Sequence, residues 1–360
     1  MPSLFDPFRL GGLTLPNRVV MAPMTRSRAG ADGLVTDSVA AYYAQRATAG
    51  LLITEGIQPS LRSQSTANTP GLHTSEQVAA WKKVTDAVHA KGGHIFAQIM
   101  HAGRVSHPQV TGTVPVGPSA VGVGTPIFAT TFGDAPGMQL APVPRELTAG
   151  EVADEIDVYV QAARNAVEAG FDGVELHGAN GYLIHQFLSS NANQRTDAYG
   201  GSISGRIRFA VEAAQATAEA IGSERVGIRL SPGSQLWGIE EEDVPTLYTT
   251  LVEALAPLDL AYLHTVATAD EDVLLNMRKL WPGAFIVNPS TVINPLPSGK
   301  ADGEDWLARG ADLISFGRAY LANPDLVERF RADAPLAEAE AETIYHGGDQ
   351  GYITYPALEH

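Results

Sequence analysis

The sequence predicts an α/β fold, a single (β/α)8 TIM barrel that spans residues 1–360. Eight short apolar runs alternate along the chain with eight helical patterns, which is the order expected when helices cover parallel strands. No segment has the composition of an interdomain linker, and 360 residues are a common length for one barrel with insertions. An N-terminal β-hairpin and a long capping insertion after the third strand complete the expected architecture.

The hairpin is expected within residues 3–17, because Gly11-Gly12 is a turn signal between two short apolar segments. We expect it to plug one end of the barrel. The barrel strands follow as short apolar runs, which are typical of parallel strands buried on both faces. These strands are expected at residues 19–21, 51–53, 95–97, 174–176, 226–228, 260–262, 285–287 and 313–316.

Helical patterns with recognisable start and stop signals separate the strands. Thr148 and Glu151 form a capping box that opens one helix, and Gly92-Gly93 is a C-cap that closes another. The helices are expected at residues 37–48, 75–91, 149–168, 204–221, 243–256, 270–280, 302–309 and 324–331.

The stretch 104–147 interrupts this alternation. It is rich in Gly, Pro, Val and Thr and has little helical periodicity. Loops of this length are uncommon in compact domains and usually carry function. Because the stretch follows a barrel strand, on the side where barrel enzymes keep their sites, we expect a strand-containing cap over the mouth.

Composition and charge exclude several classes of partner. The chain has 40 acidic and 24 basic side chains, a net charge of −16, which argues against broad binding of nucleic acid or anionic membranes. Cysteine is absent, so no disulfide or thiolate site is possible. No run approaches the roughly 18 apolar residues of a membrane helix, and no signal peptide is evident. We expect a cytoplasmic monomer or homodimer.

Candidate functional residues lie where the predicted strands end, because barrel enzymes place their chemistry there. These positions hold mostly amides, hydroxyls, arginines and glycines. They are Ala22, Pro23, Met24, Thr25, Glu55, Gly56, Gln98, His101, His177, Asn180, Tyr182, Arg229, His264, Thr265, Asn288, Gly317 and Arg318.

Three kinds of barrel chemistry fit this set poorly. All lysines lie in predicted helices or turns, so no strand end offers a Schiff-base lysine. The first strand supplies no metal ligand, although Glu55, His101, His177 and His264 are candidate ligands elsewhere, and we expect no metal site. No serine lies on a Gly-x-Ser-x-Gly elbow. A metal-dependent hydrolase stays open as an alternative.

The remaining groups suit a flat, polar, redox-active ring with a phosphate tail. Gln98 offers both a donor and an acceptor, and Thr25 offers a hydroxyl. Arg229 can stabilise a reduced, anionic ring by its charge. Gly317 and Arg318 follow the eighth strand, where barrels often bind phosphate.

Several strings, all in the expected order, resemble the old yellow enzyme family of flavin-dependent ene-reductases. The resemblance implies a barrel that holds FMN non-covalently, takes NADPH or NADH as reductant, and reduces activated C=C bonds of α,β-unsaturated carbonyl or nitro compounds. A barrel that binds flavin or phenolic ligands without catalysis is the other alternative. The strings are MAPMTR (21–26), TEGIQ (54–58), AQIMHAGR (97–104), HGANGYLIHQFL (177–188), NQRTDAYGGS (193–202), FGRAYLANPDL (316–326) and a tail with Tyr345, Tyr352 and Tyr355-Pro356.

The resemblance also implies roles for single residues. Tyr182 matches the family's proton donor, and His177 and Asn180 match the pair that binds the substrate's oxygen. Thr25 matches the residue that tunes the flavin potential. The expected cofactor-binding residues are Ala22, Pro23, Met24, Thr25, Gly56, Gln98, Arg229, Asn288, Gly317 and Arg318.

Some positions depart from the family pattern. Met100 stands where relatives often carry a bulky aromatic residue, so the substrate pocket is expected to be roomier there and to use Trp237 as a wall. Asn288-Pro289-Ser290 replaces a glycine-rich turn, and because proline has no N–H the phosphate needs other donors. Tyr345 is either a packed tail residue or a lid over the substrate.

Charged residues outside these strings are expected to support the structure. We expect Arg195 and Asp197 to form an ion pair that fixes a long loop. Arg26 and Arg28 are expected on a solvated surface. His101, His185 and His264 are expected to cap or support the site rather than to take part directly.

Overall fold

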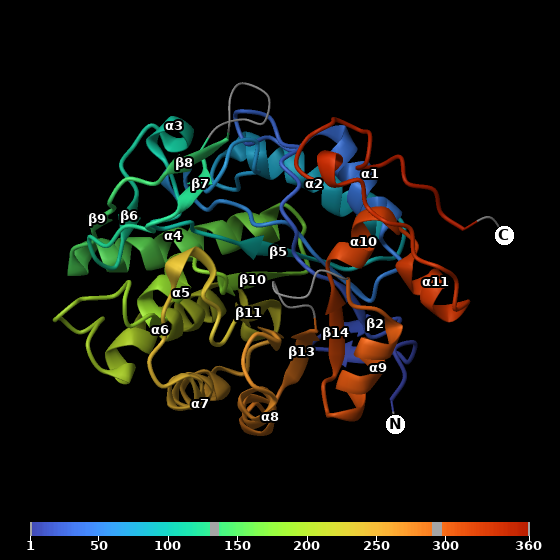
Figure 1. Cartoon of the computed structure of the whole chain (residues 1–360). Coiled ribbons are helices and arrows are strands. Elements are labelled where there is room, and N and C mark those ends of the chain that lie inside the picture. Colours follow the sequence, from blue (N-terminus) through green and yellow to red (C-terminus); the bar gives the residue numbers. More distant parts are fainter. Residues whose placement is uncertain (1, 130–136, 290–296, 359–360) are drawn as a thin grey trace.

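A computed structural model describes residues 2–129, 137–289 and 297–358. Its centre is a closed barrel of eight parallel strands with helices around it, which confirms the predicted fold (Figure 1). Each strand pairs with the next along the chain, and the last pairs with the first. The strands are β3 (Val19–Met21), β4 (Leu51–Ile53), β5 (Ile95–Ile99), β10 (Gly173–Gly178), β11 (Val226–Leu230), β12 (Tyr262–Val266), β13 (Ala284–Asn288) and β14 (Leu313–Phe316).

The helices begin where the sequence carries its caps. Thr74 and Thr148 each accept a hydrogen bond from the third helical N–H of a capping box. Two short helices that the sequence patterns did not predict, α5 (Leu183–Leu188) and α10 (Arg318–Ala322), follow β10 and β14. Within the described ranges, no helix has the length and apolar character to cross a membrane. The longer helices are α1 (Asp37–Gln45), α2 (Ser75–His89), α4 (Ala149–Glu168), α6 (Ile203–Ile221), α7 (Val244–Leu255), α8 (Glu271–Leu280) and α9 (Lys300–Ala308), with α11 (Leu326–Arg331) after α10.

One predicted strand is misplaced. The apolar run 260–262 was expected to be the sixth barrel strand, but β12 begins at Tyr262 and continues to Val266. His264 and Thr265 therefore lie inside the strand and not beyond its end. Both are fully buried, and His264 is hydrogen-bonded on both ring nitrogens inside the barrel. A buried strand with polar residues does not show the apolar run that the prediction relied on.

The predicted hairpin closes the N-terminal end of the barrel. β1 (Phe8–Leu10) and β2 (Leu13–Leu15) pair in antiparallel fashion around Gly11-Gly12, and Gly11 has the positive φ of +52° that favours glycine. Leu10 and Leu15 belong to a buried apolar cluster with strand residues from around the barrel. The strand members of this cluster include Val20, Leu51, Ile53, Phe96, Tyr262, Ile286 and Leu313.

The capping insertion contains short strands, as expected. β6 (Val116–Gly117) pairs with β9 (Arg145–Glu146), and β7 (Pro126–Phe128) pairs with β8 (Met138–Leu140). These elements gather with α3 (Pro108–Thr111) on one side of the barrel (Figure 1).

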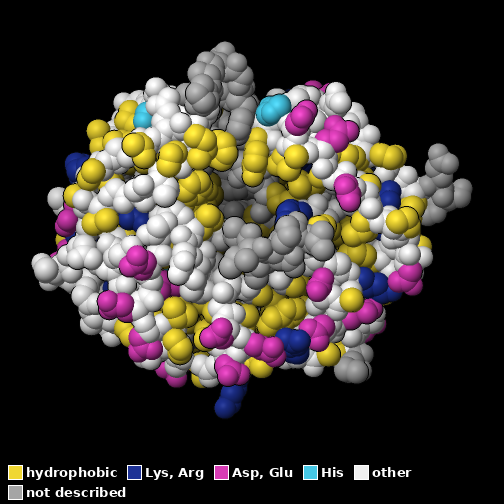
Figure 2. Space-filling view, viewed as in Figure 1, with side chains coloured by type: hydrophobic (Ala, Val, Ile, Leu, Met, Phe, Trp, Pro, Cys, Tyr) yellow, Lys and Arg dark blue, Asp and Glu magenta, His cyan; other side chains and the backbone are white. Residues whose placement is uncertain are grey.

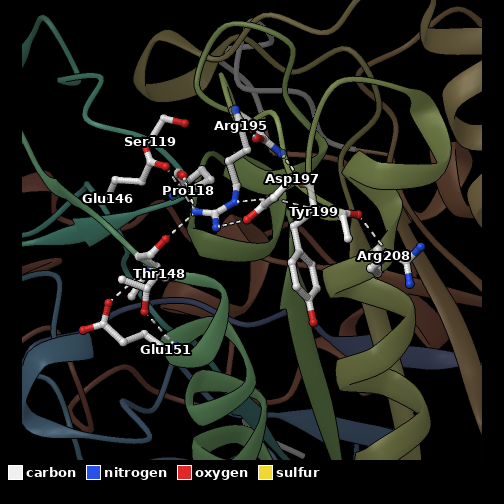
Figure 3. A network of polar contacts seen from close by, with 12 residues as sticks. Pro118, Ser119, Glu146, Thr148, Glu151, Arg195, Asp197, Tyr199 and Arg208 are labelled. Carbon is white, nitrogen blue, oxygen red and sulfur yellow. Dashed lines mark hydrogen bonds and ion pairs between the residues drawn. The ribbon is translucent and has the colours of Figure 1, made fainter.

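The buried Arg195 fastens this insertion to the loop before α6 (Figure 3). Arg195, on the loop before α6, donates from Nη1 to the carbonyl oxygens of Pro118 (2.9 Å) and Leu147 (2.5 Å). Its Nε donates to Asp197 Oδ1 at 2.9 Å, so the predicted ion pair is present. Because Pro118 follows β6 and Leu147 follows β9, Arg195 joins both of these paired strands to one loop.

Arg26 and Arg28 are buried, so the prediction of a solvated surface for them is wrong. Arg26 donates to the carbonyl oxygens of Ile344 and Gly351, each at 2.9 Å, and Arg28 donates to that of Gly348 at 3.0 Å. The C-terminal segment folds back over both side chains. Contacts across more than 300 residues leave no local pattern in the sequence from which this burial could be read.

Candidate active site

A cavity of about 120 Å³ lies between the barrel mouth, the capping insertion and the C-terminal segment. Figure 2 shows a hollow in this face of the molecule, bordered by hydrophobic side chains. Four residues that the sequence analysis singled out, Thr25, Tyr182, Trp237 and Tyr345, meet in this one wall. The full lining is Thr25, Ser27, Ser65, Thr66, Val105, Ile127, Phe128, Tyr182, Trp237 and Tyr345.

The end of β10 and the turn that follows it carry the predicted histidine, asparagine and tyrosine. The His177 ring lies 5.2 Å from the Tyr182 ring, centroid to centroid. Asn180 has a positive φ of 56°, which is strained for a residue other than glycine, and its N–H donates to Ser231 Oγ at 2.8 Å. Gly181 N–H donates to His185 Nδ1 at 3.0 Å. These bonds to side chains outside the turn hold it in a conformation that it would not adopt alone.

Burial fixes the protonation states of His177 and Tyr182. Burial lowers the pKa of His177 well below its usual value, and the nearby charge of Arg229 lowers it further. The imidazole is therefore neutral at pH 7. Burial raises the pKa of Tyr182 to about 12, so the phenol stays protonated. His177 Nδ1 is buried and finds no hydrogen-bond partner within the described part of the chain.

Five polar residues inside the barrel form a connected chain below the mouth, which we call the barrel polar layer. Gln98 Nε2 donates to Glu175 Oε1 at 2.7 Å, and His264 Nδ1 lies 2.8 Å from Glu175 Oε2. His264 Nε2 lies 2.8 Å from Ser315 Oγ, and Asn288 Nδ2 donates to Ser315 O at 2.8 Å. The layer thus links β5, β10, β12, β13 and β14.

Arg229 lies beside this layer and has an unused hydrogen-bond donor. In the strand register it stands between His177 on β10 and His264 on β12. Its Nε is buried and lacks a hydrogen-bond partner among the residues described. Burial lowers its pKa, and the charge of Glu175 opposes that shift. A buried guanidinium with an unfilled donor calls for an acceptor from a ligand, which fits the electron-rich edge of a flavin ring.

Glycines at the barrel mouth allow neighbouring side chains to pack directly against the backbone. A Cβ built on Gly56 would lie 2.6 Å from Met100 Sδ, so Met100 packs directly over that glycine. Gly317 lies against Met24 and Ala22, at 3.6 and 3.9 Å from its ideal Cβ position, so the ends of β3 and β14 meet.

The remaining predicted cofactor residues lie around the same ends. Pro23 is partly buried between Ala22 and Met24, and Arg318 is an exposed first residue of α10. The Asn288-Pro289-Ser290 turn is described only as far as Pro289, so Ser290 lies outside the described residues.

The other histidines hold loops in place, as expected. His101 Nδ1 accepts from Gly103 N–H at 2.9 Å, and its Nε2 lies 3.3 Å from Glu155 Oε2. His185 Nε2 lies 3.1 Å from Glu241 Oε1. Across residues 2–129, 137–289 and 297–358, no group of three or more His, Asp or Glu side chains could hold a metal ion.

Sequence reasoning missed seven residues that shape the site, which are Ser27, Ser65, Thr66, Val105, Ile127, Phe128 and Glu175. Ser65 and Thr66 line the cavity from an irregular segment with no motif, and Phe128 lines it from the insertion. Glu175 did carry a signal, because an acidic residue inside an apolar strand must find partners there.

Comparisons with known proteins agree with this geometry. Residues 3–337 match the model of the NADH:flavin oxidoreductase / NADH oxidase family. A probable flavin mononucleotide-dependent alkene reductase of Leishmania infantum is 40% identical, covering 99% of this chain and 97% of that protein. 12-Oxophytodienoate reductase 1 of Oryza sativa subsp. japonica is 41% identical, covering 99% and 93%.

Solved structures give the same result. Morphinone reductase in complex with tetrahydroNAD superposes with a TM-score of 0.94 at 42% identity, covering 100% of this chain and 98% of that one. A family model that matches nearly the whole chain, relatives near 40% identity and the barrel geometry all agree. The chain belongs to the NADH:flavin oxidoreductase / NADH oxidase family, the old yellow enzymes.

Proposed function

We propose that this protein is an FMN-dependent NAD(P)H ene-reductase of activated C=C bonds in α,β-unsaturated carbonyl compounds, and of nitroalkenes. The observation that carries this proposal is a buried His177 Nδ1 without a hydrogen-bond partner in the described part of the chain, near the end of β10, close in sequence to Asn180 and beside the protonated phenol of Tyr182. Tyr182 lines the cavity together with Thr25, whereas His177 and Asn180 are not part of its lining. Donors for an oxygen next to an acid that lines a cavity suit the reduction of a polarised alkene.

The cofactor fits the residues that surround the barrel mouth. Bound there, FMN would supply the hydride for the alkene, and NADPH or NADH would supply the reducing equivalents. Arg229 and Gln98 are proposed to hold the pyrimidine edge, with the guanidinium ready for the negative charge of the reduced ring. The close approach of Ala22, Met24 and Gly317 suits a flat ring.

The phosphate is assigned to the ends of the last two strands. Asn288, Gly317 and Arg318 are proposed to bind it, because barrels commonly place phosphate there. The solved morphinone reductase complex contains tetrahydroNAD, which supports a nicotinamide nucleotide as the reductant here. A cytoplasmic location and a monomeric or homodimeric state stay predictions.

His177 and Asn180 are proposed to bind the substrate's oxygen. Addition of hydride to the β-carbon moves negative charge onto that oxygen, so donors aimed at it stabilise the transition state. A neutral imidazole offers one N–H for this purpose, and the Asn180 amide offers another. Loss of one such donor typically costs about 3 kcal/mol of transition-state stabilisation.

Tyr182 is proposed to protonate the α-carbon. A phenol with a pKa of about 12 is a weak acid, but the developing carbanion is much more basic, so the proton moves downhill. Val105 and Ile127 lie in the same wall and keep water away from the reacting carbon. Met100, Trp237 and Tyr345 are proposed to set which substrates fit.

A spectroscopic titration tests the proposal. The purified protein should be yellow, should bleach with NADPH, and should recover its colour with cyclohexenone. Phenol should give a long-wavelength charge-transfer band, which His177→Ala combined with Asn180→Ala should abolish. Survival of the band would remove the oxygen-binding role, and binding of flavin and phenols without turnover would favour a non-catalytic binding protein.

A further inference from the structure

Glu175 is a buried acid for which the proposed reaction has no use. It lies in the middle of β10, its side chain is fully buried inside the barrel, and the residues on either side of it are Val174 and Leu176. An ionised carboxylate in such surroundings is costly unless it is paired and hydrogen-bonded. Its contacts therefore indicate what the carboxylate does in this position.

Both carboxylate oxygens are occupied by neighbours from other strands. Oε1 accepts from Gln98 Nε2 at 2.7 Å, and Oε2 lies 2.8 Å from His264 Nδ1. Burial alone would raise the pKa of Glu175, but His264, Arg229 and Gln98 outweigh it and bring the pKa below its usual value. The group is therefore ionised at pH 7.

An ionised carboxylate can only accept hydrogen bonds. Gln98, which stands opposite Glu175 in the register of β5 and β10, must therefore turn its NH₂ group toward Glu175. Its carbonyl oxygen must then face the other way. The same rule fixes His264, which carries its proton on Nδ1 and accepts at Nε2 from the Ser315 hydroxyl.

The orientation of the Gln98 amide decides whether a ligand on its free side finds a hydrogen-bond acceptor or a donor. The pyrimidine edge of a flavin presents one N–H donor, at N3, between two carbonyl acceptors. A Gln98 carbonyl oxygen can accept from that N–H, whereas a flipped amide would place two donors face to face. An unpaired or opposed polar group in a dry site costs far more than the hydrogen bond itself gains.

We propose that Glu175 is a positioning residue that holds the amide of Gln98 with its carbonyl oxygen toward the N3–H of FMN. This inference rests on the proposed contact between Gln98 and the cofactor. It assigns to Glu175 a part in cofactor recognition, although the residue itself does not touch the ring.

A double-mutant cycle on FMN affinity tests it, using apoprotein and fluorescence quenching of added FMN. Glu175→Gln keeps the shape of the side chain but can both donate and accept, so it releases the Gln98 amide. We expect about tenfold weaker FMN binding for this variant, the effect of roughly one hydrogen bond. Gln98→Ala should weaken binding similarly, and adding Glu175→Gln to Gln98→Ala should cause no further loss.

Each outcome of the cycle has a distinct meaning. If Gln98→Ala leaves FMN affinity unchanged, the proposed contact between Gln98 and FMN fails. If Gln98→Ala weakens binding but Glu175→Gln does not, or if the two losses simply add, then Glu175 does not act through Gln98 and the inference is overturned. Ser315→Ala, at the far end of the same chain of bonds, is the matched control and should change affinity by less than about twofold.

A measurement on the unaltered holoenzyme covers the case in which Glu175→Gln does not fold. Reconstituted with ¹⁵N-labelled FMN, the protein should show an N3–H resonance that exchanges slowly with water and is shifted as for a strong hydrogen bond. A rapidly exchanging N3–H resonance at the position of free FMN would overturn the proposal. Thermal unfolding of the apoproteins separates lost recognition from lost stability.

Discussion

Tyr182 lines the cavity, although most of its surroundings are apolar. Its ring packs with Val105, Val123 and Ile127 and lies beside Trp237 in the cavity wall. Burial raises its pKa to about 12, so the phenol holds its proton throughout the physiological range. Tyr182 can therefore donate its proton to the α-carbon at any physiological pH, once the alkene has accepted negative charge.

Removal of this hydroxyl should slow only one half of the catalytic cycle. Tyr182→Phe should slow reoxidation of the reduced flavin by cyclohexenone by about a hundredfold or more, because proton donation from a placed acid contributes that much. Flavin reduction by NADPH should stay within about twofold, since it needs no such proton. Stopped-flow measurement of both half-reactions checks this, with Tyr199→Phe as a control whose hydroxyl bonds Glu212 outside the cavity. Equal losses in both half-reactions would contradict the proton-donor role.

Glu55 should impose a pH dependence on stability. It is 1% exposed, its Oε2 accepts from Arg26 N–H at 3.2 Å, and burial raises its pKa to about 7. Between its ordinary value and pH 7 the folded protein therefore holds a proton that the unfolded chain has lost. Stability contributed by that proton is present at low pH and is lost as pH rises toward 7.

The change should be on the order of 3 kcal/mol across this window. Glu55→Gln should remove it, so urea unfolding at pH 5 and pH 7.5 should differ less for the variant than for the unaltered protein. Glu342→Gln, at an exposed position, is the control and should leave the difference unchanged. A variant that keeps the full pH difference would show that another group is responsible.

At the level of elements, Arg195 should be important for holding the capping insertion in place. Arg195→Ala would leave the buried carbonyls of Pro118 and Leu147 without a donor, and should cost about 3 kcal/mol of unfolding free energy. Limited proteolysis should then cut within residues 104–147 first, and urea unfolding gives the magnitude. Arg208→Ala, an exposed neighbour in Figure 3 that pairs with Glu212, should cost less than about 0.5 kcal/mol. Similar losses for both variants would contradict the role of Arg195 as a fastener.

The predicted strands end too early wherever the barrel interior is polar. The apolar runs end before Gln98, His177 and Arg229, and the run taken for the sixth strand ends before His264, although all four residues lie inside strands. Apolar runs mark strand residues only where the inward positions are apolar. Where the barrel polar layer replaces apolar packing, the hydrogen-bond partners come from other strands, and no local pattern records them.

At the level of the whole molecule, the hairpin plug should contribute strongly to stability. Leu15 is fully buried at the closed end of the barrel, so Leu15→Ala should cost roughly 2–5 kcal/mol by lost burial and a cavity. Thr14→Ala, at the exposed position beside it, should change the unfolding free energy by less than about 0.5 kcal/mol. Urea unfolding measures both. A small effect at Leu15 would mean that the barrel end closes without the hairpin.

The overall fold was predictable because each barrel unit carries its own caps and apolar runs. The residues at the barrel mouth were also predictable, since the strings around Thr25 and His177–Tyr182 are local. The parts of the cavity lining that come from the insertion and the C-terminal segment were not predictable. Phe128 comes from the insertion, and Arg26 and Arg28 are buried by a segment more than 300 residues away. Local patterns cannot report such distant packing.

The hydrogen bonds from Arg26 and Arg28 to the C-terminal segment determine when the site can form during synthesis. Arg26 meets Ile344 across 318 positions, and Tyr345 follows immediately in the cavity wall. When the ribosome has synthesised all eight barrel strands, the residues that form this part of the cavity wall have not yet been added to the chain. The binding pocket is therefore completed only after translation passes Gly351, and a growing polypeptide has no finished pocket in which to hold a substrate.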